Sequence, residues 1–336
     1  MSALSALHGV VSTFASNLFI NLPVPQGDEN LQQQIIIVTG SNVGLGLETS
    51  RHLLRLGVGR LIMAVRNLAK GEAARKELLA STGRDAASTE VWQLDMDSYD
   101  SIKAFSDRAS QLPRLDGVLA NAGLMTTKFS LSEGNEKTLT VNVISTFLLC
   151  LLLLSRMRES EKQTGNPCRF VVPNSAMHYW APLEELDDVD EIMSRLNDST
   201  GAKMGGRYPL SKLLVIFVVR ELAERCQASP IINTPNPSYC KSELLREQAG
   251  FVTNVTDKLL ARGTEMGSRA LYHDLFAGKE SHGCYLTNCH VQTPARHVTS
   301  EKGQRIQKAF FNQLIEKLEK IQPGISLNLN GVDVIG

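Results

Sequence analysis

Short runs of β-branched and other apolar residues alternate with longer stretches of helical spacing along this chain. We interpret the short runs as strands, because they are compact and bounded by turn-forming residues. They are Ile35–Thr39, Arg60–Val65, Glu90–Leu94, Gly117–Asn121, Arg169–Pro173, Ile231–Thr234 and Cys284–Thr287. Helical spacing is found near residues 44–57, 68–81, 98–112, 134–160, 208–228, 254–277 and 300–321. This alternation predicts an α/β fold with a parallel, doubly wound sheet.

The first 25 residues are apolar enough to be mistaken for a targeting segment. They lack a basic beginning, and polar residues such as His8, Ser12 and Asn17 keep them short of the ~20 apolar residues that a span needs. We interpret residues 1–32 as an amphipathic helix and linker appended to a catalytic domain at 33–336, with no transmembrane span. Two placements of this helix stay open: docking on the domain, or weak contact with a membrane surface through residues 1–25.

Two irregular segments interrupt the alternation. Residues 176–207 carry the acidic run Glu184–Glu191 and several glycines, and they exceed the length of ordinary connections. Residues 238–262 follow the sixth predicted strand and reach the same carboxyl edge of the sheet. We predict that both segments cover a substrate.

The run Phe147–Leu154 is apolar on every side. That pattern is typical of a helix buried in the core. It suits a helix in a dimer interface equally well, so a monomer and a homodimer both stay open.

Charge and cysteine content narrow the class of protein. Lys+Arg and Asp+Glu both total 35, which gives no basic excess to attract nucleic acid. The six cysteines form no CxxC pair and no metal-ligand spacing. We therefore expect an enzyme of a reducing, cytoplasmic compartment with no metal site.

A glycine-rich turn directly follows the first predicted strand and leads into a helix. The turn runs Gly40, Ser41, Asn42, Val43, Gly44, Leu45, Gly46. Glycines let the backbone approach a pyrophosphate, and the helix N-terminus offers free N–H groups and a positive dipole. The position of the turn after a strand predicts a dinucleotide-binding loop.

The residue that closes the second strand distinguishes NAD from NADP. An acidic residue there would bond the ribose hydroxyl of NAD, whereas this chain has Arg66, with Lys70 nearby. A guanidinium suits the 2′-phosphate of NADP, so we expect NADP(H) as cofactor.

Two further strand ends face the same crevice. Asp95, with Met96 beside it, follows the third strand and is suited to accept the adenine amino group. Asn121, Ala122 and Gly123 close the fourth strand. An ordinary helix cap at Asp95 and an ordinary turn at Asn121 are the alternative interpretations.

The chemistry is predicted at Tyr208 and Lys212. Their spacing of four places a phenol and an ammonium on one helix face. A free Tyr has a pKa of ~10, and a neighbouring cation is expected to lower it. Ser175, after the strand Arg169–Pro173, is expected in the same cleft, and Asn142 is expected to hold a water for proton relay.

Taken in order, these motifs resemble the short-chain dehydrogenase/reductase superfamily over roughly residues 33–290. Ser41–Glu48 and Ala64–Asn67 are similar to the retinol-dehydrogenase-like branch and to fungal reductases of secondary metabolism. The resemblance implies a single Rossmann-type domain of about seven parallel strands and a Ser175, Tyr208, Lys212, Asn142 tetrad. It also implies that Lys212 bonds the nicotinamide ribose and that Pro237 and Ser242 lie by the carboxamide. The chain departs from the family with Asn174 before Ser175 and Ser238 in place of glycine after Pro237.

The predicted substrate walls are mostly apolar or aromatic. They are Met125, Met177, His178, Tyr179, Trp180 and Tyr239. Such walls favour a bulky lipophilic ketone, reduced by NADPH, from polyketide-like or other secondary metabolism. Oxidation of a retinoid- or steroid-like alcohol, and a cofactor-binding scaffold without turnover, are the alternatives. For His178, lining the pocket or anchoring a loop is favoured over acid catalysis.

Overall fold

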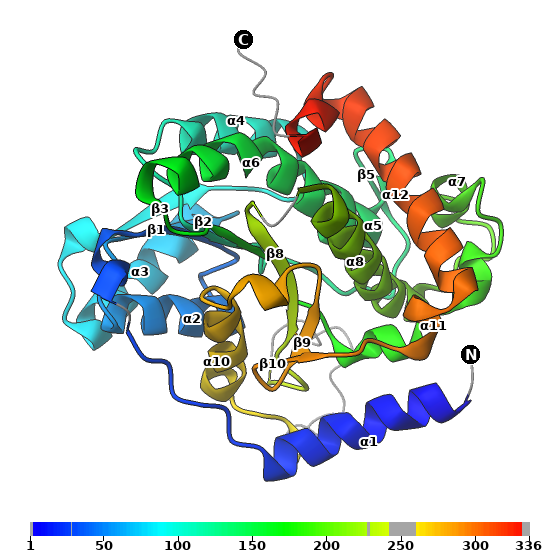
Figure 1. The fold of residues 1–336 in the computed structure, drawn as a ribbon, viewed down its shortest axis with the longest axis horizontal. Helices are drawn as coiled ribbons and strands as arrows, with labels where there is room; N and C mark the ends of the chain where they lie inside the picture. Colours follow the sequence, from blue (N-terminus) through cyan, green and yellow to red (C-terminus); the bar gives the residue numbers. More distant parts are fainter. Residues whose placement is uncertain (1–2, 28, 227–228, 242–259, 331–336) are drawn as a thin grey trace.

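The computed structural model describes residues 3–27, 29–226, 229–241 and 260–330. Their centre is an eight-stranded sheet (Figure 1) in the order β10-β9-β8-β7-β4-β1-β2-β3. The strands are β1 (Ile35–Thr39), β2 (Arg60–Val65), β3 (Thr89–Gln93), β4 (Gly117–Leu119), β7 (Arg169–Val171), β8 (Ile231–Asn236), β9 (Tyr285–Thr287) and β10 (His290–Gln292). All neighbours pair in parallel except β9 and β10. The predicted α/β fold is confirmed.

The sheet is buried on both faces, which explains why its strands read as continuous apolar runs. In β1, Ile35 and Ile37 join one core cluster while Ile36 and Val38 join the other. Helices α2 (Gly44–Arg55), α3 (Leu68–Thr82) and α10 (Thr264–Asp274) cover one face. The other face carries α4 (Tyr99–Ser110), α6 (Ser145–Thr164) and α8 (Met204–Cys226), with α12 (Glu301–Ile321) packed on α8.

Two short strand pairs were not expected. The antiparallel strand β10 brings the sheet to eight strands rather than about seven, after a turn at Asn288 and Cys289 that both have positive φ. Its three residues are all exposed, so no hydrophobic alternation marks it in the sequence. The hairpin of β5 (Leu131–Ser132) and β6 (Asn135–Glu136) replaces the start of the helix predicted at 134–160.

That predicted helix consists of three segments. A short α5 (Lys137–Leu139) leads through a π-helical turn, η3 (Thr140–Ile144), into α6. Residues 137–164 together are long and apolar enough to cross a membrane, but 89% of the most apolar window is buried inside the protein. Phe147–Leu154 therefore packs chiefly in the core, with only Leu152 partly exposed.

The N-terminal helix α1 (Ala3–Phe19) lies along one edge of the molecule, away from the sheet (Figure 1). It contacts the short 3₁₀ helix η4 (Ala176–Trp180), and Asn17 donates hydrogen bonds to the carbonyls of Tyr239 and Leu260. The structure therefore has α1 docked on the domain, and its outward side keeps no contact with the described residues that would prevent a further contact.

The irregular segment 176–207 contains secondary structure of its own. After η4 come the 3₁₀ helix η5 (Leu183–Leu186) and the one-turn helix α7 (Ile192–Leu196). Of the second segment, 238–262, residues 242–259 lie outside the described residues. The remaining elements are η1 (Glu29–Gln33), η2 (Ala86–Ser88), η7 (Lys279–Ser281), α11 (Arg296–Thr299) and η8 (Ile325–Asn330).

Candidate active site

The carboxyl ends of β1, β4 and β7 meet at one edge of the sheet, and the predicted site residues follow them. Asn121, after β4, donates from Nδ2 to the carbonyl of Thr39 at 3.1 Å. The Thr39 hydroxyl, at the end of β1, accepts a hydrogen bond from the Ala122 backbone at 2.8 Å. The sequence places Thr39 at the head of the glycine turn without indicating a role for it, and the structure has it join the two loops.

The glycine turn is packed too closely for side chains at two of its positions. A Cβ at Gly46 would lie 2.6 Å from both Asn121 Nδ2 and the Gly40 carbonyl oxygen. Gly40 has φ +64° and would meet the Ala122 backbone. Gly44 also has positive φ, and nothing lies within 4 Å of where its Cβ would be. The backbone therefore offers an open approach to a ligand at the start of α2.

The beginning of α2 fits an anion. Val43 stands at the N-cap and provides no side-chain hydrogen bond to the first turn. The buried Ser41 hydroxyl has no hydrogen-bond partner among the described residues. Free helix N–H groups, the helix dipole and an unpaired hydroxyl together match the phosphate of a dinucleotide.

Arg66 and Lys70 are exposed beside this crevice, directly after β2. Asn67 caps α3 by accepting a hydrogen bond from the Lys70 backbone at 3.0 Å. The Arg66 charge contributes to a lowered pKa of Asp97, whose strongest stabilising partner is Lys137. No hydrogen bond or ion pair of the Arg66 guanidinium is found within the described part of the chain, so it can meet an incoming phosphate.

Asp95 is half-buried at the end of β3 and one of its oxygens accepts a hydrogen bond from the Asp97 backbone at 3.0 Å. It is not the cap of α4; Ser98 has that role. Met96 is buried in the core next to it. Asp95 therefore remains placed for a cofactor contact, whereas Met96 packs inward.

Tyr208 and Ser175 are brought together. Tyr208 is 7% exposed near the start of α8, and the Ser175 side chain is close enough to influence the pKa of its phenol. Ser175 caps η4, where its Oγ also accepts from the Met177 backbone at 3.2 Å. The strand end of β7 and the helix α8 thus present two hydroxyls side by side.

The expected lowering of the Tyr208 pKa by a nearby cation is not what the structure gives. Burial raises the pKa of Tyr208 above its usual value, and the Ser175 side chain offsets this only in part. The phenol is therefore protonated near neutral pH. The spacing of Tyr208 and Lys212 in the sequence predicts the neighbouring charge. It does not indicate how deeply the Tyr208 ring is buried.

The pKa of Lys212 is shifted in the opposite direction. Burial lowers the pKa of Lys212 to about 8. Its ammonium nitrogen lies 5.5 Å from the centre of the Tyr208 ring and donates to the Pro173 carbonyl at 2.7 Å. The pair shares one helix face as predicted, with the lysine close to its ionisation point at neutral pH.

Asn142 lies in the π-helical turn and is 3% exposed. Its side-chain oxygen accepts from the Leu124 backbone, and its Nδ2 donates to the Leu124 carbonyl and to Ser211 Oγ. Ser211 in turn donates to the Tyr208 carbonyl at 2.8 Å. Both amide hydrogens of Asn142 are committed to protein, so its visible contribution is to join the loop after β4 to the catalytic helix.

Asn174 was noted only as a departure from the family pattern, and it has a structural role. It is buried, and its Nδ2 donates to the Lys212 carbonyl and to Thr234 Oγ1, both at 3.1 Å. Its Oδ1 accepts from the Ser175 backbone at 2.8 Å. Asn174 therefore fixes Ser175 relative to Lys212.

His178 does not line a pocket. It is fully buried, its Nδ1 is hydrogen-bonded to the Ser175 carbonyl, and its Nε2 accepts from the Ala295 backbone. Burial lowers its pKa to about 3, so the ring is neutral. The loop-anchor interpretation holds, and the place of His178 among the substrate walls was wrong because both ring nitrogens are used.

The other predicted walls are differently placed. Met125, Met177 and Trp180 are half-buried beside the site. Tyr179 is mostly buried, with Gly9 of α1 packed against it. Tyr239 is half-buried and its ring meets the edge of Phe14, also from α1, at 6.3 Å between centroids. The N-terminal helix therefore backs two of the predicted walls.

The loop after β8 keeps an unusual backbone without glycine. Ser238 has φ +70°, and its backbone N–H donates to Asn236 Oδ1 at 3.0 Å. The neighbouring Pro237 is buried. Ser242, predicted to contact the carboxamide, lies outside the described residues.

A buried ion cluster next to Tyr208 was not predicted. Arg207 is 2% exposed and lies 3.2 Å from Glu185 of η5 and 3.7 Å from Glu136. Glu136 caps α5 by accepting from the Thr138 and Leu139 backbones. Arg207 therefore links the segment 176–207 to the elements that carry Asn142.

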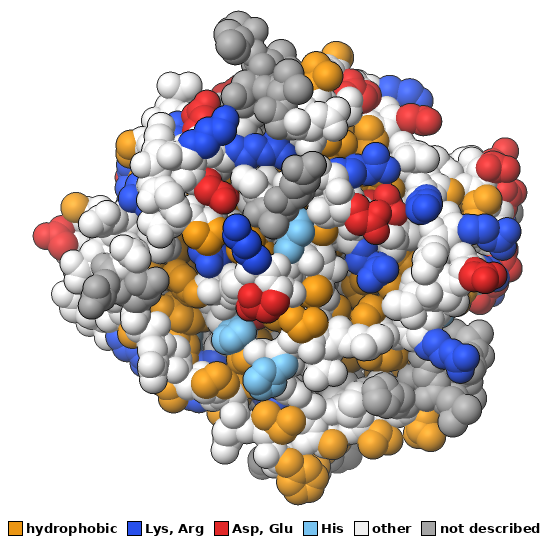
Figure 2. Space-filling view, viewed as in Figure 1, with side chains coloured by type: hydrophobic (Ala, Val, Ile, Leu, Met, Phe, Trp, Pro, Cys, Tyr) orange, Lys and Arg blue, Asp and Glu red, His pale blue; other side chains and the backbone are white. Residues whose placement is uncertain are grey.

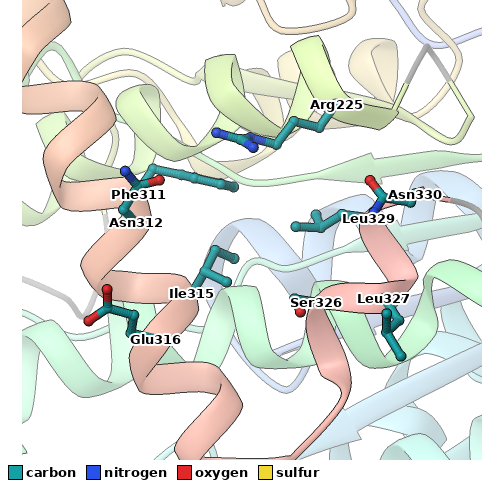
Figure 3. A pocket seen from close by; sticks show the side chains of 9 residues that line it. All are labelled: Arg225, Phe311, Asn312, Ile315, Glu316, Ser326, Leu327, Leu329 and Asn330. Atoms are coloured by element: carbon teal, nitrogen blue, oxygen red, sulfur yellow. The ribbon is translucent and has the colours of Figure 1, made fainter.

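A cavity of about 430 Å³ lies elsewhere (Figure 3). Its walls come from α8, α12 and η8, and Arg225 stacks there on the ring of Phe311 at 4.6 Å. It contains none of the predicted cofactor or catalytic residues. Among the described residues, no group of three or more His, Cys, Asp or Glu side chains is placed to hold a metal ion.

Comparison with known proteins places this geometry in a family context. Residues 34–166 match the family model described as short chain dehydrogenase. The short chain dehydrogenase/reductase dmxR8 of a Cryptosporiopsis species is 40% identical, covering 93% of this chain and 98% of that protein. The short-chain dehydrogenase anuD of Penicillium roqueforti is 39% identical, covering 99% of this chain and 87% of that protein.

Solved structures share the fold. An uncharacterized protein from Mycobacterium paratuberculosis has a TM-score of 0.62 at 23% identity, covering 88% of this chain and 96% of that one. A short chain dehydrogenase from Shigella flexneri complexed with NADP has a TM-score of 0.56 at 23% identity, covering 78% and 98%. At these identities the likeness extends to the fold alone.

Proposed function

This chain belongs to the short-chain dehydrogenase/reductase family, and from that premise we propose that it is an NADPH-dependent carbonyl reductase. Membership makes it an oxidoreductase that acts on alcohols or ketones. The proposal adds the cofactor, the direction and the class of substrate: a ketone on a bulky lipophilic metabolite of secondary metabolism.

The proximity of the Ser175 hydroxyl to the Tyr208 phenol supports the proposal most directly. Two hydroxyls at the mouth of the crevice, one on each side of a carbonyl oxygen, can orient that oxygen and polarise the carbonyl. The same edge of the sheet carries the glycine turn. A pair of hydroxyls beside a dinucleotide loop is the arrangement that carbonyl reduction requires.

The residues present fit NADPH. The glycine turn, Ser41 and the start of α2 would hold the pyrophosphate, Asp95 the adenine, and Arg66 with Lys70 the 2′-phosphate. When bound there, the cofactor supplies the hydride that reduces the carbonyl carbon. Exposed cations at the end of β2, where an NAD enzyme needs a carboxylate, support NADPH over NADH.

Residues of this chain would donate the proton and then replace it. Tyr208, protonated because burial raises its pKa, donates its hydroxyl proton to the carbonyl oxygen as that oxygen gains charge. Lys212, with a pKa of about 8, can return a proton towards the phenolate from solvent. Ser175 holds the substrate oxygen throughout.

Reduction is the proposed direction, in which the protonated Tyr208 donates a proton to a carbonyl oxygen. The same tyrosine, as phenolate, would accept the proton in the reverse reaction.

The test is an NADPH-oxidation assay of the full chain over a panel of polycyclic and polyketide-like ketones, with NADH in parallel. We expect turnover of at least one bulky ketone with NADPH and much slower turnover with NADH. Equal rates with both cofactors would contradict the role of Arg66. Tight NADPH binding with no turnover of any ketone would favour a scaffold without catalysis.

A further inference from the structure

The helix α1 exposes large apolar side chains, whereas a docked helix ordinarily buries them. A helix docked on a protein ordinarily buries its apolar face and exposes its polar one. In α1, Leu7, Val11 and Leu18 share one face by their spacing of four and seven, and all three are exposed. Phe14 has the same spacing but is half-buried, with its ring against the edge of Tyr239. The opposite side, with Gly9 and Ser16, meets the protein.

The inward face is held by close packing and hydrogen bonds. Gly9 is buried, and a Cβ there would lie 2.9 Å from the Tyr179 Cβ. Ser16 Oγ accepts from Asn288 Nδ2 at 2.9 Å, and Asn17 donates to two carbonyls at 2.8 Å each. These polar contacts, together with the packing of Gly9 on Tyr179 and of Phe14 on Tyr239, fix the side of α1 that faces the body.

Arg262 fixes the end of the helix. Its Nη2 donates to the carbonyls of Ser16 and Ile20 and to Asn288 Oδ1. A cation at these carbonyls also matches the negative end of the helix dipole. Arg262 is 5% exposed, so the clamp is shielded from water. The helix cannot roll its apolar face inward without breaking these bonds.

What α1 presents outward is an uncharged apolar band, which we call the outer band. Its members are 42–83% exposed: Leu7, Val11, Leu18, Phe19, Ile20 and Val24. Figure 2 shows hydrophobic side chains gathered along the lower edge of the molecule, over α1. The first 27 residues contain no Asp, Glu, Lys or Arg. The band therefore has no charge to desolvate and none with which to recognise a charged partner.

We propose that the outer band docks the protein on the surface of a lipid bilayer with electrically neutral headgroups. A helix of this kind lies in the plane of the interface with its apolar side chains at the headgroup boundary. Gly9–Phe19 is an apolar helical stretch too short to span the membrane. The rigid attachment of α1 would hold the whole protein in one orientation on that surface.

The size of the band argues against a second copy as its occupant. A 17-residue helix is about 25 Å long and about 10 Å wide, so its exposed side offers about 250 Å². A stable interface buries about 800 Å² on each partner. A bilayer needs no matching groove and can receive a single convex ridge.

The consequence concerns access to the site. The inner side of α1 backs Tyr179 and Tyr239, two predicted walls of the substrate site. A protein seated on α1 would hold these walls beside the lipid in which lipophilic compounds dissolve. The docking itself does not depend on the proposed reaction, because the outer band is defined by exposure alone.

The test is flotation of the purified full chain with phosphatidylcholine vesicles, with and without added phosphatidylserine. We expect the wild-type chain to float with both kinds of vesicle to a similar extent. In Leu7→Gln/Leu18→Gln/Phe19→Gln we expect an affinity loss of about 100-fold, because three large apolar side chains no longer enter the lipid. Thermal unfolding and NADPH binding should not change, since these side chains are exposed.

The matched control is Leu68→Gln/Leu131→Gln/Leu327→Gln, which alters three exposed leucines outside the band. It should float like the wild type. Equal flotation of the outer-band variant, absence of wild-type binding, or binding only to phosphatidylserine vesicles would overturn the proposal. The proposal would also be overturned if analytical ultracentrifugation showed a dimer of the wild-type chain and a monomer of the outer-band variant. None of these readouts uses turnover, so they are independent of the reductase assay.

Discussion

The crevice has two sides that are built in different ways. On the cofactor side, the glycine turn offers main chain, and its tight positions, Gly40 and Gly46, exclude side chains. On the proposed chemistry side, the groups are side chains: Ser175 and Tyr208 lie near each other, and Asn174 and Ser211 bond the backbone around them.

The difference teaches which changes each side tolerates. A main-chain site fails when an atom is added, because there is no room for it. A side-chain site fails when a functional group is removed, because the surrounding scaffold stays in place. Mutations on the two sides should therefore separate cofactor binding from turnover.

Tyr208→Phe should give the largest effect and the sharpest separation. We expect kcat to fall about 10³-fold, because the proton donor is lost. NADPH affinity should stay within about twofold, because the glycine turn is untouched. Stopped-flow kinetics and fluorescence titration measure the two quantities. Tyr99→Phe, which removes the hydroxyl that accepts a hydrogen bond from Asn135, is the control. Substantial residual turnover in Tyr208→Phe would remove the tyrosine from its role.

Gly46→Ala should instead act on NADPH binding. The added Cβ would press on Asn121 and on the Gly40 carbonyl, so the turn must shift. We expect NADPH affinity to fall about 10²-fold, or unfolding to become easier by about 2–3 kcal/mol. Calorimetric titration and denaturant unfolding follow both. Gly205→Ala, where no atom lies within 4 Å, should lose neither. Normal NADPH binding by Gly46→Ala would show that the turn does not meet the cofactor.

Arg66→Ala tests the one charged part of the cofactor side. A charge-assisted bond to the 2′-phosphate predicts a rise of about tenfold in the KM for NADPH and no change for NADH. Arg75→Ala, on the same helix layer but bonded to Glu72 and to backbone carbonyls, is the control. Equal changes with both cofactors would assign the effect to structure rather than to phosphate recognition.

Lys212 tests the electrostatics of the chemistry side through pH. Its pKa is 10.5 in an ordinary setting and about 8 in the folded protein. Between these values the unfolded chain holds a proton that the folded one has released, so raising the pH stabilises the fold across this window. Below about pH 8 both states are charged and the contribution is flat.

We expect the free energy of unfolding to rise by about 2–3 kcal/mol from pH 8 to pH 10.5 through Lys212. Lys212→Met should lose that part of the rise. Urea unfolding of both proteins at several pH values measures it. Parallel curves for the two proteins would mean that Lys212 keeps an ordinary pKa.

Ser238→Gly should give the smallest effect, and in the stabilising direction. Ser238 has φ +70° and a buried hydroxyl without a described partner. Glycine removes both costs, for a gain of about 0.5–1 kcal/mol in the free energy of unfolding. Asn288→Gly is the contrast: it also has positive φ, but its side chain bonds Ser16 and Arg262, so it should destabilise. A loss of stability in Ser238→Gly would indicate that its hydroxyl has a needed partner.

The cofactor side could be predicted well because its signals are consecutive in the chain. The bounds of β1 and β2 match the expected ranges residue for residue, since both are continuous apolar runs. The glycine turn follows directly, and Arg66 ends its strand as expected. Burial on both faces of the sheet makes such strands visible in the sequence.

The chemistry side was visible only as separate residues. Their alignment depends on Asn174 and Ser211, whose bonds join positions far apart in the chain. Burial reversed the expected pKa of Tyr208 and removed His178 from the pocket, and local spacing contains no information on burial. The roles given to Ser175, Tyr208, Lys212 and Asn142 stay predictions that the variants above would test.

The clamp on α1 also has a consequence for the order in which the molecule is assembled. Arg262 is 246 residues from Ser16 in the chain. At a synthesis rate of about 5–20 residues per second, the helix leaves the ribosome about 12–50 s before the residue that clamps it. The first helix to be translated is thus among the last to find its place. Until then its inner side is open as well as the outer band, so the whole helix is available to chaperones before residue 262 has been added.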